Sequence, residues 1–92
     1  MLAQIKRRAK RPAQRRKITE LYVRKAKPGL TWDTHQRGLC LRVQPGGSRS
    51  WVVVYSRFGR SRWLTLGKAD AIGLSDARIE AGKIMVAVDA GS

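Results

Sequence analysis

The chain has 92 residues and carries 20 Lys and Arg against 6 Asp and Glu, a formal net charge of +14. This length predicts one small domain, and the charge predicts a surface that attracts DNA, RNA or an anionic membrane. No apolar run approaches the ~18 residues of a membrane-spanning helix, and no apolar segment follows the basic N-terminus as it would in a secretory signal. A single cysteine, Cys40, excludes an internal disulfide and favours a reducing cytoplasm.

The N-terminal segment, residues 1–17, holds eight Lys and Arg and no acidic residue. It has too few apolar side chains to bury, so we predict a flexible basic tail. Two interpretations stay open: a solvated extension, or an arm that lies on nucleic-acid phosphates. After the tail, the sequence predicts a short helix over residues 18–27, with Thr19 as its N-cap.

Two ring-bearing side chains follow this helix. Trp32 stands in an extended stretch, and we predict that it fills the core rather than stacking on a ligand. His35 has no Cys, His or acidic cluster beside it in the sequence. A metal site is therefore not predicted.

The centre of the chain predicts three antiparallel strands, over residues 39–44, 50–57 and 60–66. The first alternates apolar and polar residues, and the second is rich in β-branched and aromatic residues. Phe58-Gly59 predicts a two-residue hairpin turn. That turn sets a register in which Arg57 lies opposite Arg60 and, at the far end, Trp51 lies opposite Leu66.

Alternation along these strands separates two faces of the sheet. The more apolar face is assigned to the core and carries Leu39, Leu41, Val43, Trp51, Val53, Tyr55, Leu64 and Leu66. A helix is predicted over residues 74–88, and its apolar stripe is formed by Leu74, Ala77, Ala81, Ile84 and Val88. The prediction is an α+β fold, a three-stranded antiparallel sheet packed against a C-terminal helix.

The opposite face of the sheet is the candidate site, because it sets apolar groups beside cations. It presents Cys40, Arg42, Gln44, Val52, Val54, Ser56, Ser61, Trp63 and Thr65, with Arg49, Arg57 and Arg60 at the turns. A sheet of this size fits a DNA major groove. We predict base-edge contacts from Arg42 and Gln44, thymine-methyl contacts from Val52, Val54 or Trp63, and phosphate contacts from Arg49, Arg57 and Arg60. The alternative is that the N-terminal segment or another protein covers this face.

Signals of catalysis are missing from the sequence. It shows no paired carboxylates, no glycine-rich phosphate loop before a helix, no metal-ligand cluster and no Ser/His/Asp set. We therefore expect no catalytic residue, no metal, no cofactor and no small-molecule substrate. Among binding functions, double-stranded DNA is favoured over RNA, and RNA over a protein or membrane surface.

Several motifs occur in the order found in one known family. They are the run from Ile18 to Gly29, then Trp32-Asp33, then Arg37 to Val43, then Ser50 to Tyr55, then Arg60 to Gly67, then Leu74 to Arg78. Together they resemble the arm-type DNA-binding domain of prophage integrases, which are tyrosine recombinases. Family members often have a polar residue where this chain has Val54, Ser56 and Trp63, and a Ser or Thr cap at Gly73.

The resemblance implies that residues 18–90 form a domain that binds arm-type sites on double-stranded DNA during site-specific recombination. It also implies a non-catalytic piece, with the core-binding and catalytic domains absent from this chain. Other integrase protomers or an excision factor are candidate partners on the DNA, and the bacterial nucleoid is the expected location. The alternative function is a small RNA-binding or ribosome-associated basic protein.

Overall fold

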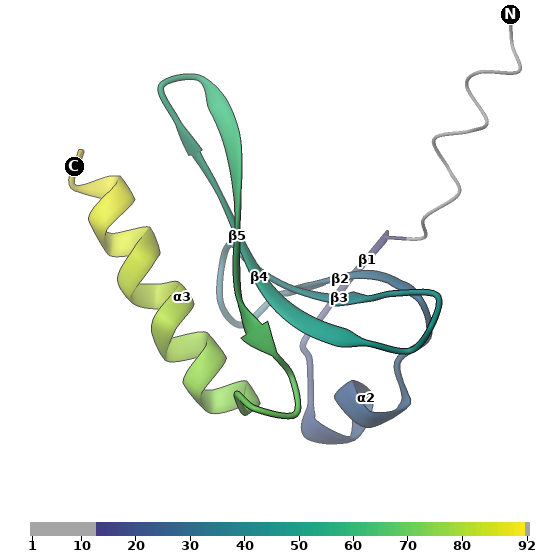
Figure 1. Ribbon diagram of the computed structural model, residues 1–92. Coiled ribbons are helices and arrows are strands. Elements are labelled where there is room, and N and C mark those ends of the chain that lie inside the picture. Colours follow the sequence, from purple (N-terminus) through teal and green to yellow (C-terminus); the bar gives the residue numbers. More distant parts are fainter. Residues whose placement is uncertain (1–12, 92) are drawn as a thin grey trace, which may run out of the picture.

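The computed structural model describes residues 13–91 and shows one sheet with two helices (Figure 1). The predicted α+β class is confirmed, but the sheet has five strands in the order β1-β2-β3-β4-β5 rather than three. The strands are β1 (Ala13–Arg16), β2 (Gly29–Asp33), β3 (Leu39–Val43), β4 (Arg49–Arg57) and β5 (Arg60–Lys68), and the helices are α2 (Glu20–Lys25) and α3 (Leu74–Asp89).

The two added strands form one side of the sheet. β2 pairs antiparallel with β3, and β1 pairs parallel with β2, so that α2 is the crossover between β1 and β2. All four residues of β1 are exposed and none is a large apolar residue, which is why alternation gave no signal. Residues 13–16, predicted as part of a flexible tail, are thus in the sheet; residues 1–12 lie outside the described part of the chain.

Both predicted helices are present. Thr19 caps α2 because its Oγ1 accepts a hydrogen bond from the backbone N of Tyr22 at 3.1 Å. α3 begins at Leu74 after Gly73, which offers no side-chain cap. Within residues 13–91, neither helix combines the length and the apolar character needed to cross a membrane.

The β4–β5 hairpin follows the predicted register from Arg57 opposite Arg60 to Val52 opposite Thr65. The register then shifts between Trp51 and Val52, and Trp51 pairs with Gly67 instead of the predicted Leu66. The tight turn has positive φ at both central residues, 53° at Phe58 and 75° at Gly59. A two-residue turn needs this geometry to match the right-handed twist of the two strands that it joins. A local shift of this kind is invisible to strict alternation.

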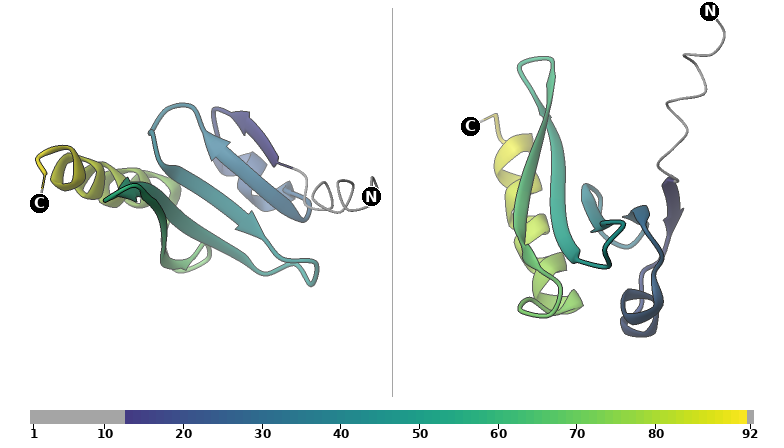
Figure 2. Two further views of the ribbon diagram at one scale, coloured as in Figure 1. Left: turned by 90° about the horizontal axis from the view of Figure 1, so that it is seen from above. Right: turned by 45° about the vertical axis from the view of Figure 1, so that its right-hand side comes forward.

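The core lies between the sheet and the two helices. α3 packs along β4 and β3, and α2 lies near the other end of the sheet (Figure 2). Ala77 and Ala81 are fully buried, and their small side chains allow α3 to approach the strands closely. The remaining buried members of the core are Ile18, Ala26, Leu39, Leu41, Val43, Trp51, Val53, Leu74 and Met85. Leu64, predicted to be in the core, is 42% exposed because α3 does not cover edge strand β5.

The tip of the β4–β5 hairpin extends beyond the rest of the sheet (Figure 1). β3 begins at Leu39, which pairs with Val53, and the carbonyl of Gly38 accepts the next hydrogen bond from Val54 N at 2.8 Å. From residue 55 to residue 62, β4 and β5 therefore have only each other as sheet neighbours. This two-stranded ribbon is the most projecting part of the sheet.

Candidate nucleic-acid interface

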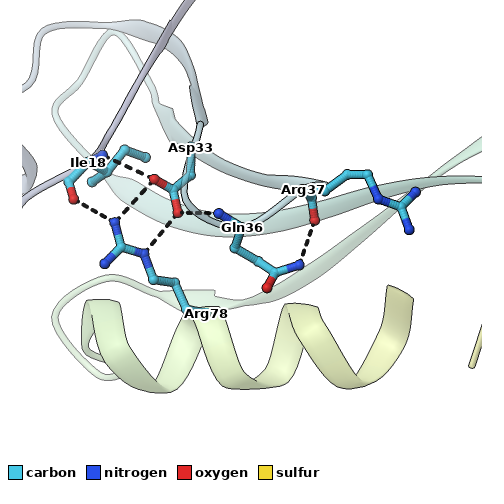
Figure 3. Close-up of polar contacts among 5 residues, drawn as sticks. All are labelled: Ile18, Asp33, Gln36, Arg37 and Arg78. Carbon is cyan, nitrogen blue, oxygen red and sulfur yellow. Dashed lines mark hydrogen bonds and ion pairs between the residues drawn. The ribbon is translucent and has the colours of Figure 1, made fainter. Parts of the chain in front are cut away.

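A buried ion pair on the inner side fixes the sheet relative to α3 and the chain before α2 (Figure 3). Arg78 Nε donates to Asp33 Oδ2 at 2.9 Å, and Arg78 Nη2 donates to the carbonyl of Ile18 at 2.7 Å. Asp33 Oδ1 also accepts from Ile18 N, and its Oδ2 accepts from Gln36 N, each at 3.1 Å. One carboxylate thus joins the end of β2 to α3 and to the segment that enters α2.

The ionised form of Asp33 is favoured despite its burial. Burial acts to raise the pKa of this carboxyl. Hydrogen bonds from Arg78 and from the backbone of Ile18 and His35, together with the positive charge of Arg78, outweigh that effect and hold the pKa below its ordinary value of 3.8. The negative charge of Asp33 therefore pairs with Arg78 inside the domain.

The face of the sheet away from α3, called here the outer face, has a tryptophan pair at its centre. Trp32 on β2 and Trp63 on β5 meet edge to face, with ring centroids 5.9 Å apart. These strands are three positions apart in the sheet, roughly 14 Å at ~4.8 Å per strand. The two side chains must therefore lean toward each other over β3 and β4.

This pair explains why two residues of the outer face are fully buried. Cys40 and Val52 have no exposed surface although neither belongs to the core cluster, and they occupy the strands that Trp32 and Trp63 span. Burial raises the pKa of the Cys40 thiol to about 11. Trp32 was predicted to fill the core, and that prediction is wrong. It lies on the outer face, away from the core, and its partner there is Trp63.

Arg42 stands beside this aromatic centre without a protein partner. It lies between Leu30 on β2 and Ser50 on β4, and its Nε atom is buried with no hydrogen bond. Among residues 13–91, no hydrogen bond or ion pair involves its guanidinium group. A cation of this kind is available to a ligand, because its donors are unused.

The three arginines predicted to ring the outer face do not do so. Arg49 Nη2 donates to the carbonyls of Arg24 at 3.0 Å and Ala26 at 3.4 Å, so its guanidinium satisfies the end of α2. Arg57 and Arg60 are opposite each other, and alternation along the hairpin puts them on the other face from Ser56 and Ser61. The alternation of side chains along a strand, read from the sequence, was sufficient to place Arg57 and Arg60 on this other face.

The other predicted site residues are distributed along the outer face. Val54 pairs with Trp63, Ser56 with Ser61, and Thr65 with Val52, while Gln44 directly follows β3 and its backbone N donates to Ser48 O at 2.8 Å. Trp63 is 51% exposed, and Ser56, Ser61 and Thr65 are also exposed. All of these except the three arginines at the turns thus lie on the outer face, although Val52, predicted to touch a thymine methyl group, is fully buried there.

Two basic residues of this surface were not predicted as site residues. Arg15 pairs with Trp32 in the β1–β2 register, and Lys68 pairs with Ser50, so both share the outer face. Arg15, Trp32, Arg37, Ser56 and Ser61 line part of a shallow hollow of about 300 Å³ where the hairpin leaves the body of the sheet. Only the parallel pairing of β1 brings Arg15 there, and no local pattern predicts that pairing.

Other kinds of site find little support in the described residues. No three His, Cys, Asp or Glu side chains of residues 13–91 gather closely enough to hold a metal ion. The outer face instead offers aromatic and aliphatic groups, hydroxyl groups and cations on a strand surface. That combination suits contacts to base edges, thymine methyl groups and phosphates.

A comparison with protein families agrees with this geometry. The family model of the Arm DNA-binding domain matches residues 3–92, which is nearly the whole chain and more than the stretch from Ile18 to Arg78 that holds the sequence motifs. In this family the domain binds DNA in integrase-type recombination and carries no catalytic site. The chain belongs to the Arm DNA-binding domain family, the domain typical of phage integrases.

Proposed function

We propose that the outer face recognises double-stranded DNA at arm-type sites by entering the major groove. The residues that would read the bases are Arg42 and Gln44, with Val54 and Trp63 against thymine methyl groups and Ser56, Ser61 and Thr65 along the strand edges. DNA binding is common to the family. The proposal adds which surface of this chain binds the DNA and which residues contact it.

The observation that carries the proposal is the unpartnered guanidinium of Arg42 beside a half-exposed aromatic centre. Leaving a buried Nε unsatisfied costs free energy in the isolated domain. A guanine supplies two acceptors, O6 and N7, in the major groove, and an arginine can bind both. The Nη groups of Arg42, which have no hydrogen-bond partner within residues 13–91, would donate to these two acceptors.

The remaining arginines have different roles in this proposal. Arg57 and Arg60, on the other face of the hairpin, would reach the phosphates along the walls of the groove, and Arg62, opposite Tyr55, shares their face. Arg49 was predicted as a phosphate contact, but its Nη2 donates to carbonyls at the end of α2 and its Nη1 to the carbonyl of Gly47. We give it a structural role instead.

This domain would act as part of a tyrosine recombinase of a prophage or similar mobile element. Core binding and strand transfer belong, in this proposal, to other domains of the integrase. Other protomers or an excision factor would be neighbours on the DNA, in the bacterial cytoplasm at the nucleoid. The predicted domain of residues 18–90 would also include β1 (Ala13–Arg16), because that strand pairs with β2.

Selection of bound duplexes from a random pool, followed by binding measurements across a salt series, tests the proposal. We expect an enriched sequence and a salt slope of ~0.9 per phosphate contacted. A steep slope without sequence enrichment would contradict arm-site recognition. Retention of co-purified RNA at moderate salt, with no preference among duplexes, would favour the RNA-binding alternative.

A further inference from the structure

Phe58, at the tip of the β4–β5 hairpin, lies outside the hydrophobic core. Its side chain is 83% exposed, and its φ is 53°. It is the only non-glycine residue with positive φ in residues 13–91. A bulky side chain at positive φ is an outlier, because a turn of this type favours Asn, Asp or Gly at that position.

Neither packing nor turn chemistry explains this residue. An exposed apolar ring contributes little to the hydrophobic core, and an Asn at the same place would fit the backbone better. A single exposed apolar residue is ordinary on a protein surface. The combination with an unfavourable backbone conformation is what points to a function for the ring.

The surroundings of Phe58 indicate the kind of partner. The guanidinium carbon of Arg57 lies 5.1 Å from the centre of the Phe58 ring, and Arg60 is directly opposite Arg57. The exposed ring thus has the cation of Arg57 beside it, and a second arginine, Arg60, stands on the neighbouring strand at the end of the ribbon. Residues 55–58 extend roughly 13 Å at ~3.3 Å per residue, which is enough to reach past the groove that the sheet occupies.

We propose that Phe58 is a wedge that inserts its ring at a base step of the bound duplex, while Arg57 and Arg60 hold the flanking phosphates. Partial unstacking at that step kinks the DNA, as apolar side chains do when they enter a base step. The inference rests on the proposed function, because the same duplex occupies the outer face. It adds a bend and a second point of contact, away from the bases that Arg42 reads.

The test compares the whole chain with its Phe58→Asn and Phe58→Leu variants on the selected duplex. The duplex, about 30 base pairs long, carries a donor and an acceptor dye at its ends and 2-aminopurine at successive positions. We expect wild type to shorten the end-to-end distance and to increase 2-aminopurine emission at one step. Phe58→Leu keeps an apolar wedge and should retain both signals, whereas Phe58→Asn should lose both and bind about tenfold more weakly.

Thermal unfolding separates this role from a structural one. Because Asn accepts positive φ more readily than Phe, Phe58→Asn should melt at the wild-type temperature or above. If it melts lower, Phe58→Gly, which also fits the turn, replaces it in the DNA assays.

Three results would overturn the wedge. They are wild-type bending by Phe58→Asn, a straight duplex with wild type, and loss of affinity in Phe58→Asn without any change in 2-aminopurine emission. Absence of duplex binding by wild type would instead refute the proposed function.

Discussion

Two arginines on opposite sides of the sheet, Arg78 on α3 and Arg42 on β3, have opposite surroundings. On the inner side, Arg78 is bonded to Asp33 and to the carbonyl of Ile18. On the outer face, the Nε of Arg42 is buried but has no hydrogen-bond partner. Both guanidinium groups are partly removed from water, yet only that of Arg78 forms hydrogen bonds within the domain. The difference indicates that Arg78 serves stability and that Arg42 serves a ligand.

The largest effect should come from breaking the inner pair. Arg78→Ala leaves the fully buried carboxylate of Asp33 without its cation, and such a loss costs about 3–5 kcal/mol of unfolding free energy. Urea unfolding measures it. The double variant Arg78→Met with Asp33→Leu, which removes both charges, is the control and should recover part of the loss. Equal stability of wild type and Arg78→Ala would contradict the role of this pair.

Acid should weaken the inner pair in a smaller and reversible way. The folded pKa of Asp33 is lowered, so its contribution to stability is present above the unfolded pKa of about 3.9 and is lost as pH falls through the folded value. Melting temperatures measured from pH 6 down to pH 2 should therefore fall in the acidic limb. In Asp33→Asn the same limb should be shallower, and an identical limb would assign the effect to other carboxyls.

The reactivity of the Cys40 thiol measures how well Trp32 and Trp63 shield the outer face from solvent. Its pKa is raised to about 11 by burial, about two units above that of a free thiol, so the reactive thiolate should be about a hundredfold scarcer at pH 8. Alkylation by iodoacetamide, followed by mass spectrometry, should be slow in the folded domain and fast in urea. Trp63→Ala, which opens the cover, should react faster than wild type. Rapid alkylation of wild type would contradict the burial.

Arg42 should show the reverse of Arg78: little effect on folding and a selective effect on DNA. Arg42→Ala removes a buried, unsatisfied donor and should therefore not lower the free energy of unfolding, yet it should weaken binding to the selected site by about 1–3 kcal/mol. Fluorescence anisotropy with selected and scrambled duplexes separates the two kinds of contact. An equal loss on both duplexes would make Arg42 a phosphate contact, and Arg60→Ala, at a proposed phosphate contact, is the control that should show such an equal loss.

Local sequence patterns were sufficient for the elements that depend on near neighbours. The Thr19 cap and the Phe58-Gly59 turn are each encoded within a few residues, and both are present in the structure. The predicted stripe of α3 is present in part: Leu74, Ala77 and Ala81 are buried, but the next buried residue is Met85, while Ile84 and Val88 are only partly buried. Because a two-residue turn fixes the pairing of both strands, most of the hairpin register followed from it. The inner and outer faces of β3 and β4 were separable because successive side chains along a strand point to opposite faces.

The tertiary structure decided the features that depend on partners far along the chain. The parallel pairing of β1 with β2, the meeting of Trp32 with Trp63, and the capture of Arg49 by the carbonyls of α2 have no local signature. A side chain's type sets what it can bond, but only the fold sets which partners come within reach. The sequence alone therefore determined that this chain presents a basic sheet face, and the tertiary structure decided which of its arginines are left free to bind.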